Sequence, residues 1–315
     1  MITKIDNLLH NVNKVAISGH VRPDGDCVGS CLGLYNYITD NYKDIEVRVF
    51  MEKTSQVFSY IRGFDKVENE IPTDEFDLFI SLDTSDVERI GVIKNIYTES
   101  ENTVCIDHHI SNKGFATRNY IEGEMSSCCE VLYNMLDKEK ISKETAEALY
   151  TGIIHDTGVF KYSSTTEETM KAAGFLVGKG IDKTKIIDDG FYAKTYNQNQ
   201  IMGRALLESI LILDGKCIFS VVTKDNMEFY GVEPHELGGI VEQLRLTEGV
   251  ECAIFLYETS HMEYKVSLRS KDYVDVNAVA SYFSGGGHIR AAGCTMRGTV
   301  HDVVNNIVRE IEKQI

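Results

Sequence analysis

The sequence of 315 residues has few of the features that mark membrane proteins or unfolded chains. It contains only 3 prolines, and no segment is proline-rich or of low complexity. No run approaches the roughly 18 consecutive apolar positions that a membrane-spanning helix needs. The first residues, MITKIDNLLHNVNK, lack the basic start, the apolar core and the cleavage site of a signal peptide. We therefore expect a globular, cytoplasmic protein, and the length suggests two domains.

The cysteines form no Cys-x-x-Cys pair. They are Cys27, Cys31, Cys105, Cys128, Cys129, Cys217, Cys252 and Cys294. This spacing argues against a zinc ribbon. In a chain of this size without a signal peptide, we expect reduced and mostly buried thiols.

Positive charge is scarce. The chain carries 32 lysines and arginines against 48 aspartates and glutamates, which gives a formal net charge of −16. Tight binding of long nucleic acids needs many basic side chains over a broad face, so this composition argues against it. It does not exclude a short anionic ligand held by a few local cations, and a bound metal ion would reverse the local charge.

The first half of the sequence alternates between short apolar runs and helical patterns. The runs KVAIS, IEVRVFM, FDLFISL and NTVCI are rich in valine and isoleucine, which favours β-strands. Helical patterns cover residues 28–37, 128–137, 143–154 and 167–180. Such alternation is typical of a parallel sheet with helices on both faces. The sequence therefore predicts an α/β protein whose first domain is a Rossmann-like parallel sheet.

The pattern changes after residue 180. A polar segment from about Ile181 to Gln200 predicts a helix and a linker, and the strand-like runs KCIFSVVT, VECAIFLYET and EYKVSLRS follow it. The last residues, VHDVVNNIVREIEKQI, have a helical pattern. We expect a first domain over residues 1–185, a helical linker over 186–205 and a smaller mixed α/β domain over 206–315.

Acidic and imidazole side chains follow several of the apolar runs. They are His20, Asp24 and Asp26 after the first run, Asp83 after the third, Asp107, His108 and His109 after the fourth, and His155 and Asp156 after a helical pattern. Parallel strands end at one edge of a sheet, where such folds bind their ligands. A single aspartate there, such as Asp24 or Asp86, is explained by N-capping or by a turn. The recurrence favours a binding site instead.

Clustered carboxylates repel one another and raise each other's pKa, and a divalent cation removes this conflict. Aspartate oxygens and histidine nitrogens, with no thiolate among these positions, suit Mn²⁺ or a similar ion better than a structural zinc. One carboxylate that bridges two ions is the expected arrangement for a clamp on a phosphoryl group. The pattern therefore predicts a metal centre.

Five segments in series resemble a known family. HVRPDGD, SLDTSD, CIDHH and HDTGVF match, in order, the four motifs of the DHH phosphoesterase superfamily. GGGHIRAAG, residues 285–293, resembles the glycine-rich motif of the domain that accompanies the DHH domain. The resemblance spans essentially the whole chain and indicates the branch of stand-alone nanoRNases with pAp phosphatase activity. It implies a catalytic DHH domain, a substrate-binding second domain and an active site in the cleft between them.

The resemblance also implies roles for individual residues. It implies six metal ligands: His20 and Asp24 at one ion, Asp26, His108 and Asp156 at the other, and Asp83 between the two. The ions are expected to be Mn²⁺, with Mg²⁺ or Co²⁺ as alternatives. Asp107 would orient a neighbouring group, and His109 would face the substrate phosphate as a charge stabiliser or proton donor.

In the second domain, the resemblance places Arg269 and His288 in contact with the substrate. Glycines allow backbone N–H groups to approach an anion closely, which gives Gly286 and Gly287 a binding role beside His288. A flexible turn is the alternative for a glycine triplet alone. We also expect the following residues, 289–293, to begin a helix whose N-terminus faces the same anion.

Several other polar residues allow two interpretations. His155 stands where a small or neutral residue is expected, and we interpret it as a packed or solvent-facing histidine. Asn112 and Arg118 either contact the substrate or belong to a solvated loop. Ser126 and Ser127 either contact a phosphate or cap a helix, and capping explains them at least as well.

The resemblance implies a manganese-dependent phosphoesterase that hydrolyses short oligoribonucleotides and 3′-phosphoadenosine 5′-phosphate (pAp). The alternative with the same chemistry is a phosphodiesterase for cyclic di-AMP or pApA, and a different alternative is a nucleotide sensor without activity. The glycine-rich motif argues against a manganese inorganic pyrophosphatase. The expected partners are short RNA or small nucleotides, with no long duplex and no membrane, and a homodimer is left open.

Overall fold

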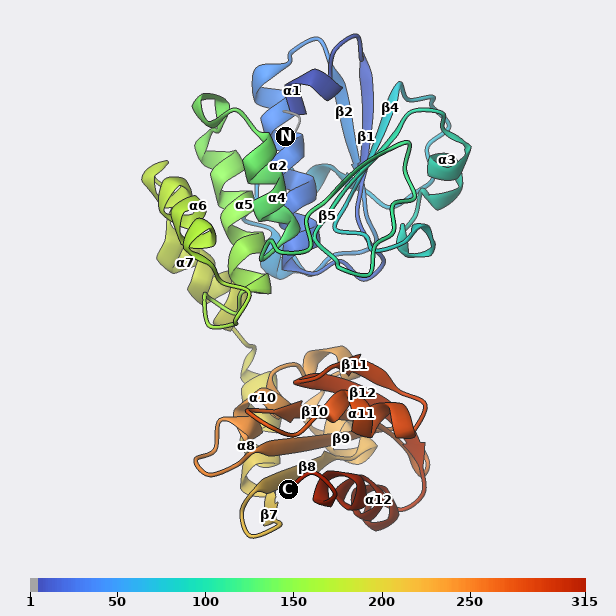
Figure 1. Cartoon of the computed structure of the whole chain (residues 1–315), viewed down its shortest axis with the longest axis vertical. Coiled ribbons are helices and arrows are strands. Elements are labelled where there is room, and N and C mark those ends of the chain that lie inside the picture. The colour runs from blue at the N-terminus through green and yellow to red at the C-terminus, as the bar shows by residue number, and fades with distance from the viewer. Residues whose placement is uncertain (1–4) are drawn as a thin grey trace. The chain divides into compact units, whose positions relative to one another are not determined.

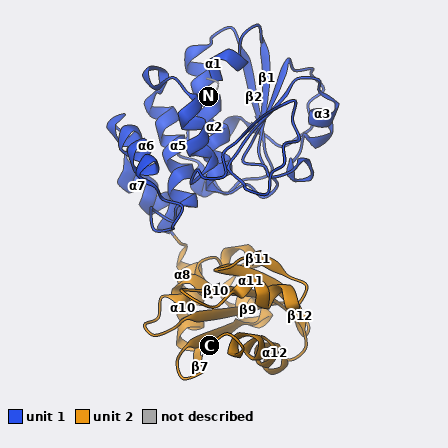
Figure 2. Cartoon of the chain, in the orientation of Figure 1, with its two compact units in different colours: residues 1–193 blue, residues 194–315 orange. Residues whose placement is uncertain are grey.

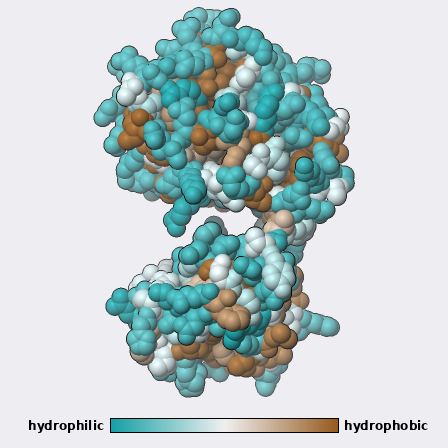
Figure 3. All heavy atoms as spheres, turned by 180° about the vertical axis from the view of Figure 1, so that it is seen from behind, coloured by the Kyte–Doolittle hydropathy of each residue, from teal (hydrophilic) through white to brown (hydrophobic). Residues whose placement is uncertain are grey.

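The computed structural model describes residues 5–315 and divides into two compact units, residues 1–193 and 194–315 (Figure 2). The division lies within the segment 186–205 that was expected to be a linker. The surface seen in Figure 3 is mainly hydrophilic on both units. Within residues 5–315, every helix is too short or too polar to cross a membrane.

The first unit contains a six-stranded sheet in which every pair of neighbouring strands is parallel. The strands are β1 (Lys14–Ser18), β2 (Glu46–Phe50), β3 (Val67–Glu68), β4 (Leu78–Leu82), β5 (Thr103–Asp107) and β6 (Arg118–Ile121). Their order in the sheet is β3-β2-β1-β4-β5-β6. This order reverses between β1 and β4, which is the point where doubly wound sheets bind ligands. The predicted α/β fold is confirmed.

Helices cover both faces of this sheet (Figure 1). The α-helices are α1 (Ile5–Leu8), α2 (Gly25–Asn41), α3 (Lys94–Glu99), α4 (Cys128–Met135), α5 (Lys143–Asp156), α6 (Glu167–Gly178) and α7 (Lys183–Ile187). Shorter 3₁₀ turns are η1 (Gln56–Phe58), η2 (Phe64–Lys66), η3 (Val87–Arg89) and η4 (Lys138–Lys140), and η5 (Asp188–Tyr192) is a π-helix. The main core lies between the sheet and α2, α4 and α5, while α3 covers the other face around Phe79 and Tyr97.

Glycines let α2 and α5 approach closely. A Cβ atom at Gly29 of α2 would lie 2.9 Å from the backbone nitrogen of Gly152 on α5. A Cβ atom at Gly152 would lie 2.2 Å from Cys129 Sγ and 2.5 Å from Asp26 Oδ1. Contacts this short have no room for a methyl group, so the glycines hold the start of α2 against α5.

The second unit contains a mixed six-stranded sheet with the order β11-β12-β10-β9-β8-β7. Its strands are β7 (Ile210–Ile212), β8 (Cys217–Val222), β9 (Cys252–Ser260), β10 (Glu263–Ser270), β11 (Gly286–His288) and β12 (Ala291–Arg297). Its helices are α8 (Tyr196–Leu207), α9 (Lys224–Tyr230), η6 (Pro234–Glu236), α10 (Ile240–Arg245), α11 (Val276–Tyr282) and α12 (Val300–Glu312). One face of the sheet packs on α11 and α12 and the other on α8, α9 and α10. The predicted mixed α/β domain is therefore present.

The expectation of a helix at residues 289–293 is wrong. Gly286 and His288 belong to β11, and residues 291–297 form β12, so the motif is a hairpin. Gly286 pairs with Gly293, and Gly287 has a φ angle of +154°, which favours glycine. Pairing of β12 with β10 outweighs the helix preference of the sequence Arg-Ala-Ala.

Two further features differ in how far the sequence revealed them. The strand β6 is parallel to β5 and lies in a segment that was interpreted as a possible solvated loop. All eight cysteines are buried and free, as expected for reduced thiols.

Candidate metal centre

The carboxyl ends of β1, β4 and β5 bring the predicted ligands to one edge of the first sheet. His20 follows β1, and Asp83 follows β4, directly at the point where the strand order reverses. Asp107 is the last residue of β5, so His108 comes next. Asp26 lies in the first turn of α2, and Asp156 is the last residue of α5.

His20 points its Nε2 atom toward two aspartates. The ring donates a hydrogen bond from Nδ1 to the backbone oxygen of Val21 over 2.8 Å. Because a carbonyl oxygen only accepts, this bond leaves Nε2 as the atom that faces the site. Nε2 lies 3.4 Å from Asp83 Oδ2 and 3.7 Å from Asp24 Oδ1. Asp24 also caps α2, since the same oxygen accepts bonds from two backbone N–H groups.

His108 has the same arrangement on the other side of Asp83. Its Nδ1 atom faces the backbone oxygen of Met125 at 3.4 Å. Its Nε2 atom lies 3.1 Å from Asp156 Oδ2, 3.5 Å from Asp83 Oδ1 and 3.8 Å from Asp26 Oδ2. The imidazoles of His20 and His108 therefore face different oxygens of the Asp83 carboxylate.

Asp83 is a buried carboxylate with an unusual backbone conformation. It is only 2% exposed, and its Oδ1 atom accepts no hydrogen bond. Its backbone has a φ angle of +53°, a left-handed conformation that non-glycine residues rarely adopt. A buried carboxylate oxygen without a hydrogen bond is costly, and a bound cation would supply the missing interaction. Strain of this kind is concentrated at functional sites.

Asp26 is completely buried and is held by the start of α4. Its two oxygens accept hydrogen bonds from the backbone N–H groups of Cys128 and Cys129 at 2.6 and 2.9 Å. Burial raises the pKa of Asp26 well above its usual value, and the charges of Asp156 and Asp83 raise it further. A cation among these carboxylates would remove that repulsion.

The pKa values of the two imidazoles are raised as well, which favours their charged form. Burial lowers the pKa of His20, but hydrogen bonds to Asp24 and Asp83 outweigh it and raise the pKa to about 11. Burial likewise lowers the pKa of His108, and Asp156 and Asp83 raise it to about 12. In the metal-free protein, the protonated imidazoles therefore act as counter-ions to the carboxylates.

Three overlapping groups of ligand atoms satisfy the distances of a metal site. They are His20 with Cys27 and Asp83, Asp83 with His108 and His109, and Asp26 with His108 and Asp156, each with ligand atoms within 4.8 Å of one another. Together with the Asp83 oxygen that accepts no hydrogen bond, these donors fit a divalent cation.

A hydrogen-bonded chain supports His109. Its Nδ1–H donates to Asp107 Oδ1 over 2.7 Å, and the other oxygen of Asp107 accepts a bond from Asn112 Nδ2 over 2.7 Å. Asn112 is buried and also donates to the backbone oxygen of Thr84. These bonds fix the ring of His109, and its Nε2 atom takes no part in this series of hydrogen bonds. Asn112 is therefore a support for this pair rather than part of a solvated loop.

Sequence reasoning missed Cys27. Its sulfur lies with His20 and Asp83 in the first group of ligand atoms. The side chain is completely buried, and burial raises the pKa of the thiol well above its usual value. Its place on the first turn of α2, directly after Asp26, was the available signal.

The open interpretations of three residues are now settled by contacts. His155 packs between the rings of Phe58 and Phe191, each with a centroid distance of 5.2 Å, and faces the backbone oxygen of Gly190. It is therefore a packed histidine. Ser127 caps α4, and Ser126 donates to the buried carboxylate of Glu130.

The predicted substrate residues of the second unit share one row of its sheet. His288 on β11 lies opposite Ala291 on β12, which lies opposite Arg269 on β10. Directly opposed residues of antiparallel strands point to the same face. Gly286 lies two residues from His288 on that face, and Gly287 lies between them.

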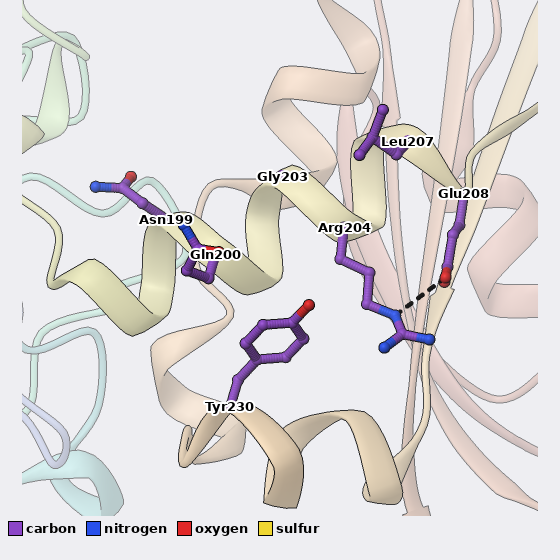
Figure 4. Close-up of a pocket in the computed structure, with 7 residues that line it drawn as sticks. All are labelled: Asn199, Gln200, Gly203, Arg204, Leu207, Glu208 and Tyr230. Carbon is purple, nitrogen blue, oxygen red and sulfur yellow. Dashed lines mark ion pairs between the residues drawn. The ribbon is translucent and has the colours of Figure 1, made fainter.

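A separate surface pocket lies beside α8 and α9 (Figure 4). It measures about 430 Å³ and is lined by residues that include Arg204, Glu208 and Tyr230. The two charged side chains pair with each other at 3.1 Å, as the dashed line in Figure 4 shows. The pocket therefore lacks the cluster of ligand atoms that the sheet edge of the first unit has.

Comparison with known proteins agrees with this geometry. The model of the DHH family, N-terminal domain, matches residues 14–153, and the model of the DHHA1 domain matches residues 214–315. The chain is 28% identical over 318 aligned positions to the bifunctional oligoribonuclease and PAP phosphatase NrnA of Bacillus subtilis, covering 99% of this chain and 98% of that protein. It is 24% identical to the cyclic-di-AMP phosphodiesterase GdpP of Bacillus subtilis, covering 96% of this chain and 48% of that protein.

A solved structure shows the same architecture. The crystal structure of an exopolyphosphatase-related protein from Bacteroides fragilis matches with a TM-score of 0.87 and 28% identity. The match covers 98% of this chain and 94% of that chain. Members of this family depend on metal ions, which agrees with the ligand groups at the sheet edge. The chain therefore contains a domain of the DHH family followed by a DHHA1 domain.

Proposed function

We propose that the chain is a manganese-dependent phosphoesterase that hydrolyses short oligoribonucleotides to mononucleotides and pAp to AMP. The observation that carries the proposal is the buried Asp83 carboxylate, with an oxygen that no donor satisfies, between two imidazoles. The similarity over nearly the full length to an oligoribonuclease and PAP phosphatase gives the substrate class.

Two ions are proposed, one on each side of Asp83. His20 and Asp24 would hold one ion, and Asp26, His108 and Asp156 would hold the other, with Asp83 shared between them. The support is that Asp83 Oδ2 faces His20 at 3.4 Å, whereas Oδ1 faces His108 at 3.5 Å. These proposed ligands are oxygen and nitrogen donors, and burial raises the pKa of the neighbouring Cys27 thiol, which favours its neutral form. Such a set suits Mn²⁺, and Mg²⁺ or Co²⁺ are alternatives.

The bound cations would lower the pKa of water and offset the negative charge of a phosphoester. The chain's own catalytic group would be His109, whose Nε2 atom would meet a phosphoryl oxygen as a charge stabiliser or a proton donor. Asp107 would hold the ring in the required tautomer, because it accepts the Nδ1 proton.

The second unit would bind the nucleotide through Arg269, His288 and the backbone of Gly286 and Gly287. Arg269 and His288 lie in one row of the sheet with only the small side chain of Ala291 between them. An anionic group fits between two such donors. An active site between the two domains stays a prediction, as do a cytoplasmic location and a preference for short single strands.

A phosphodiesterase for cyclic di-AMP or pApA is the second candidate. Its support is the similarity to GdpP, but this chain covers only 48% of that relative. The two candidates share the same motifs and chemistry, so only their rates of hydrolysis on different substrates can distinguish them.

The experiment is a substrate panel with Mn²⁺: pAp, pApA, cyclic di-AMP and RNAs of two to five nucleotides. We expect the highest kcat/KM on pAp and the shortest RNAs. Preferential turnover of cyclic di-AMP would replace the first candidate with the second. The absence of turnover on every compound would support a nucleotide sensor.

A further inference from the structure

Half of one face of the second sheet is polar and accessible. Eight residues of β10 and β12 point to this face: Glu263, Lys265, Ser267, Arg269, Ala291, Gly293, Thr295 and Arg297. All of them are exposed or half-buried. The apolar cluster under α8, α9 and α10 takes its strand residues from β8 and β9 instead. These eight positions are called the open face below.

The open face has an excess of positive charge, although the chain carries −16 overall. Its three cations are Lys265, Arg269 and Arg297, against the single carboxylate of Glu263. Arg297 is paired with Glu263 at 2.9 Å. Lys265 lies outside this pair, and its ammonium group can attract a polyanion.

Lys265 lies directly opposite an aromatic side chain. In the register of β9 and β10 its partner is Tyr257, and on its other side it pairs with Thr295. Opposed side chains in antiparallel strands have Cβ atoms about 5 Å apart on the same face. Tyr257 is half-buried and packs against the cluster under α8, α9 and α10, so its side chain is supported by the core and still partly accessible. A fixed aromatic ring beside a lysine is the combination that single-stranded nucleic acid binders use for stacking and phosphate contact.

This pair lies away from the predicted phosphate site on the same strand. Arg269 is four residues further along β10, which corresponds to roughly 13 Å at the rise of a β-strand. Between Lys265 and Arg269 lie Ser267 and, on β12, Gly293. Serine and glycine are small, so no bulky side chain of these strands separates the two cations. A strand of RNA held at Arg269 can therefore reach Tyr257 with its next nucleotides, whereas a mononucleotide cannot.

We propose that Tyr257 and Lys265 form a second nucleotide subsite, in which a base stacks on Tyr257 and a backbone phosphate contacts Lys265. The occupant is a single-stranded RNA of about three nucleotides, selected by charge complementarity and by continuity with the Arg269 row. The inference rests on the proposed function, and it makes this subsite the determinant of substrate length. Compounds as small as pAp do not occupy it.

The test compares a trinucleotide with pAp in four variants of the full chain. Tyr257→Leu should weaken binding of the trinucleotide by about 5- to 150-fold, the range found for loss of one stacked base, and Tyr257→Phe should preserve it. Lys265→Gln should reduce the salt dependence of trinucleotide binding by about 0.7 in the logarithmic slope. Lys216→Gln, an exposed lysine at the turn between β7 and β8, makes the same charge change elsewhere and should have no effect.

Binding is measured by fluorescence anisotropy with labelled trinucleotide in EDTA, and kcat/KM on pAp and trinucleotide is measured with Mn²⁺. Unchanged pAp kinetics together with selective loss of the trinucleotide supports the inference. An unchanged ratio of trinucleotide to pAp in both Tyr257→Leu and Lys265→Gln overturns it. Lys265 is exposed, so its variant decides the matter if Tyr257→Leu does not fold. Failure of the wild type to hydrolyse any nucleotide would overturn the proposed function instead. The subsite would still be tested in that case, because binding in EDTA does not depend on hydrolysis.

Discussion

His108 Nε2 lies 3.1 Å from Asp156 Oδ2, which joins the end of β5 to the end of α5. Neither residue is close to the other in sequence. Their contact requires α5 to pack on α2 with its last turn at the carboxyl edge of the sheet.

Asp83→Asn should abolish metal binding and phosphoester hydrolysis. Asparagine accepts the left-handed backbone conformation of this position but removes the negative charge. Mn²⁺ at about 100 times its Kd should stabilise the wild type by about 2.7 kcal/mol, measured as a rise in Tm, and should leave the variant unchanged. Asp86→Asn is the control, because Asp86 is an exposed N-cap of η3. A metal-induced rise in Tm of the Asp83 variant would contradict the assignment.

Asn112→Ala should lower kcat by about 10- to 100-fold, with little change in metal affinity. The substitution removes the hydrogen bond that holds Asp107, so the ring of His109 loses its fixed orientation. The readouts are steady-state kinetics on pAp and calorimetric Mn²⁺ binding. Asn119→Ala provides the same change at an exposed position of β6 and should retain activity. Equal losses in the two variants would refute a specific role for Asn112.

Metal binding should release protons and should tighten as pH rises from 6 to 9. Without metal, the pKa values of His20 and His108 are raised from 6.5 to about 11 and about 12, so both rings are protonated in this range. A cation needs their neutral nitrogens and therefore competes with protons. The ion pairs stabilise the metal-free fold fully below about pH 6.5, and this contribution is lost as pH rises through about 11. Titration calorimetry in buffers of different ionisation enthalpy measures the release; a buffer-independent heat would disprove it.

Gly152→Ala should destabilise the fold by about 1–3 kcal/mol, because a methyl group has no room there. The added Cβ atom would lie 2.5 Å from Asp26 Oδ1, so Mn²⁺ affinity should fall as well. Gly174→Ala is the matched control, since this exposed glycine of α6 has no heavy atom within 4 Å of an added Cβ. It should stabilise the protein by about 0.5–1 kcal/mol. Chemical denaturation measures both effects, and comparable stability of the two variants would count against the close α2–α5 contact.

The sequence was informative where function depends on residues at strand ends. The runs before His20, Asp83 and Asp107 have the composition of buried strands, and parallel strands must end at a common edge. The structure brings these side chains together there. The sequence was less informative at the hairpin of residues 286–297, where pairing with β10 overrode local helix preference.

By itself, the sequence determined the alternation of strands and helices, the division into two domains and the set of carboxylates and imidazoles at the sheet edge. Only the tertiary structure decided the support of Asp107 by Asn112, the approach of Cys27 to His20 and the pairing of Tyr257 with Lys265. The physical reason is that periodicity and strand endings are local properties of the chain. Hydrogen bonds, close helix contacts and strand register depend on residues that meet only after the chain has folded.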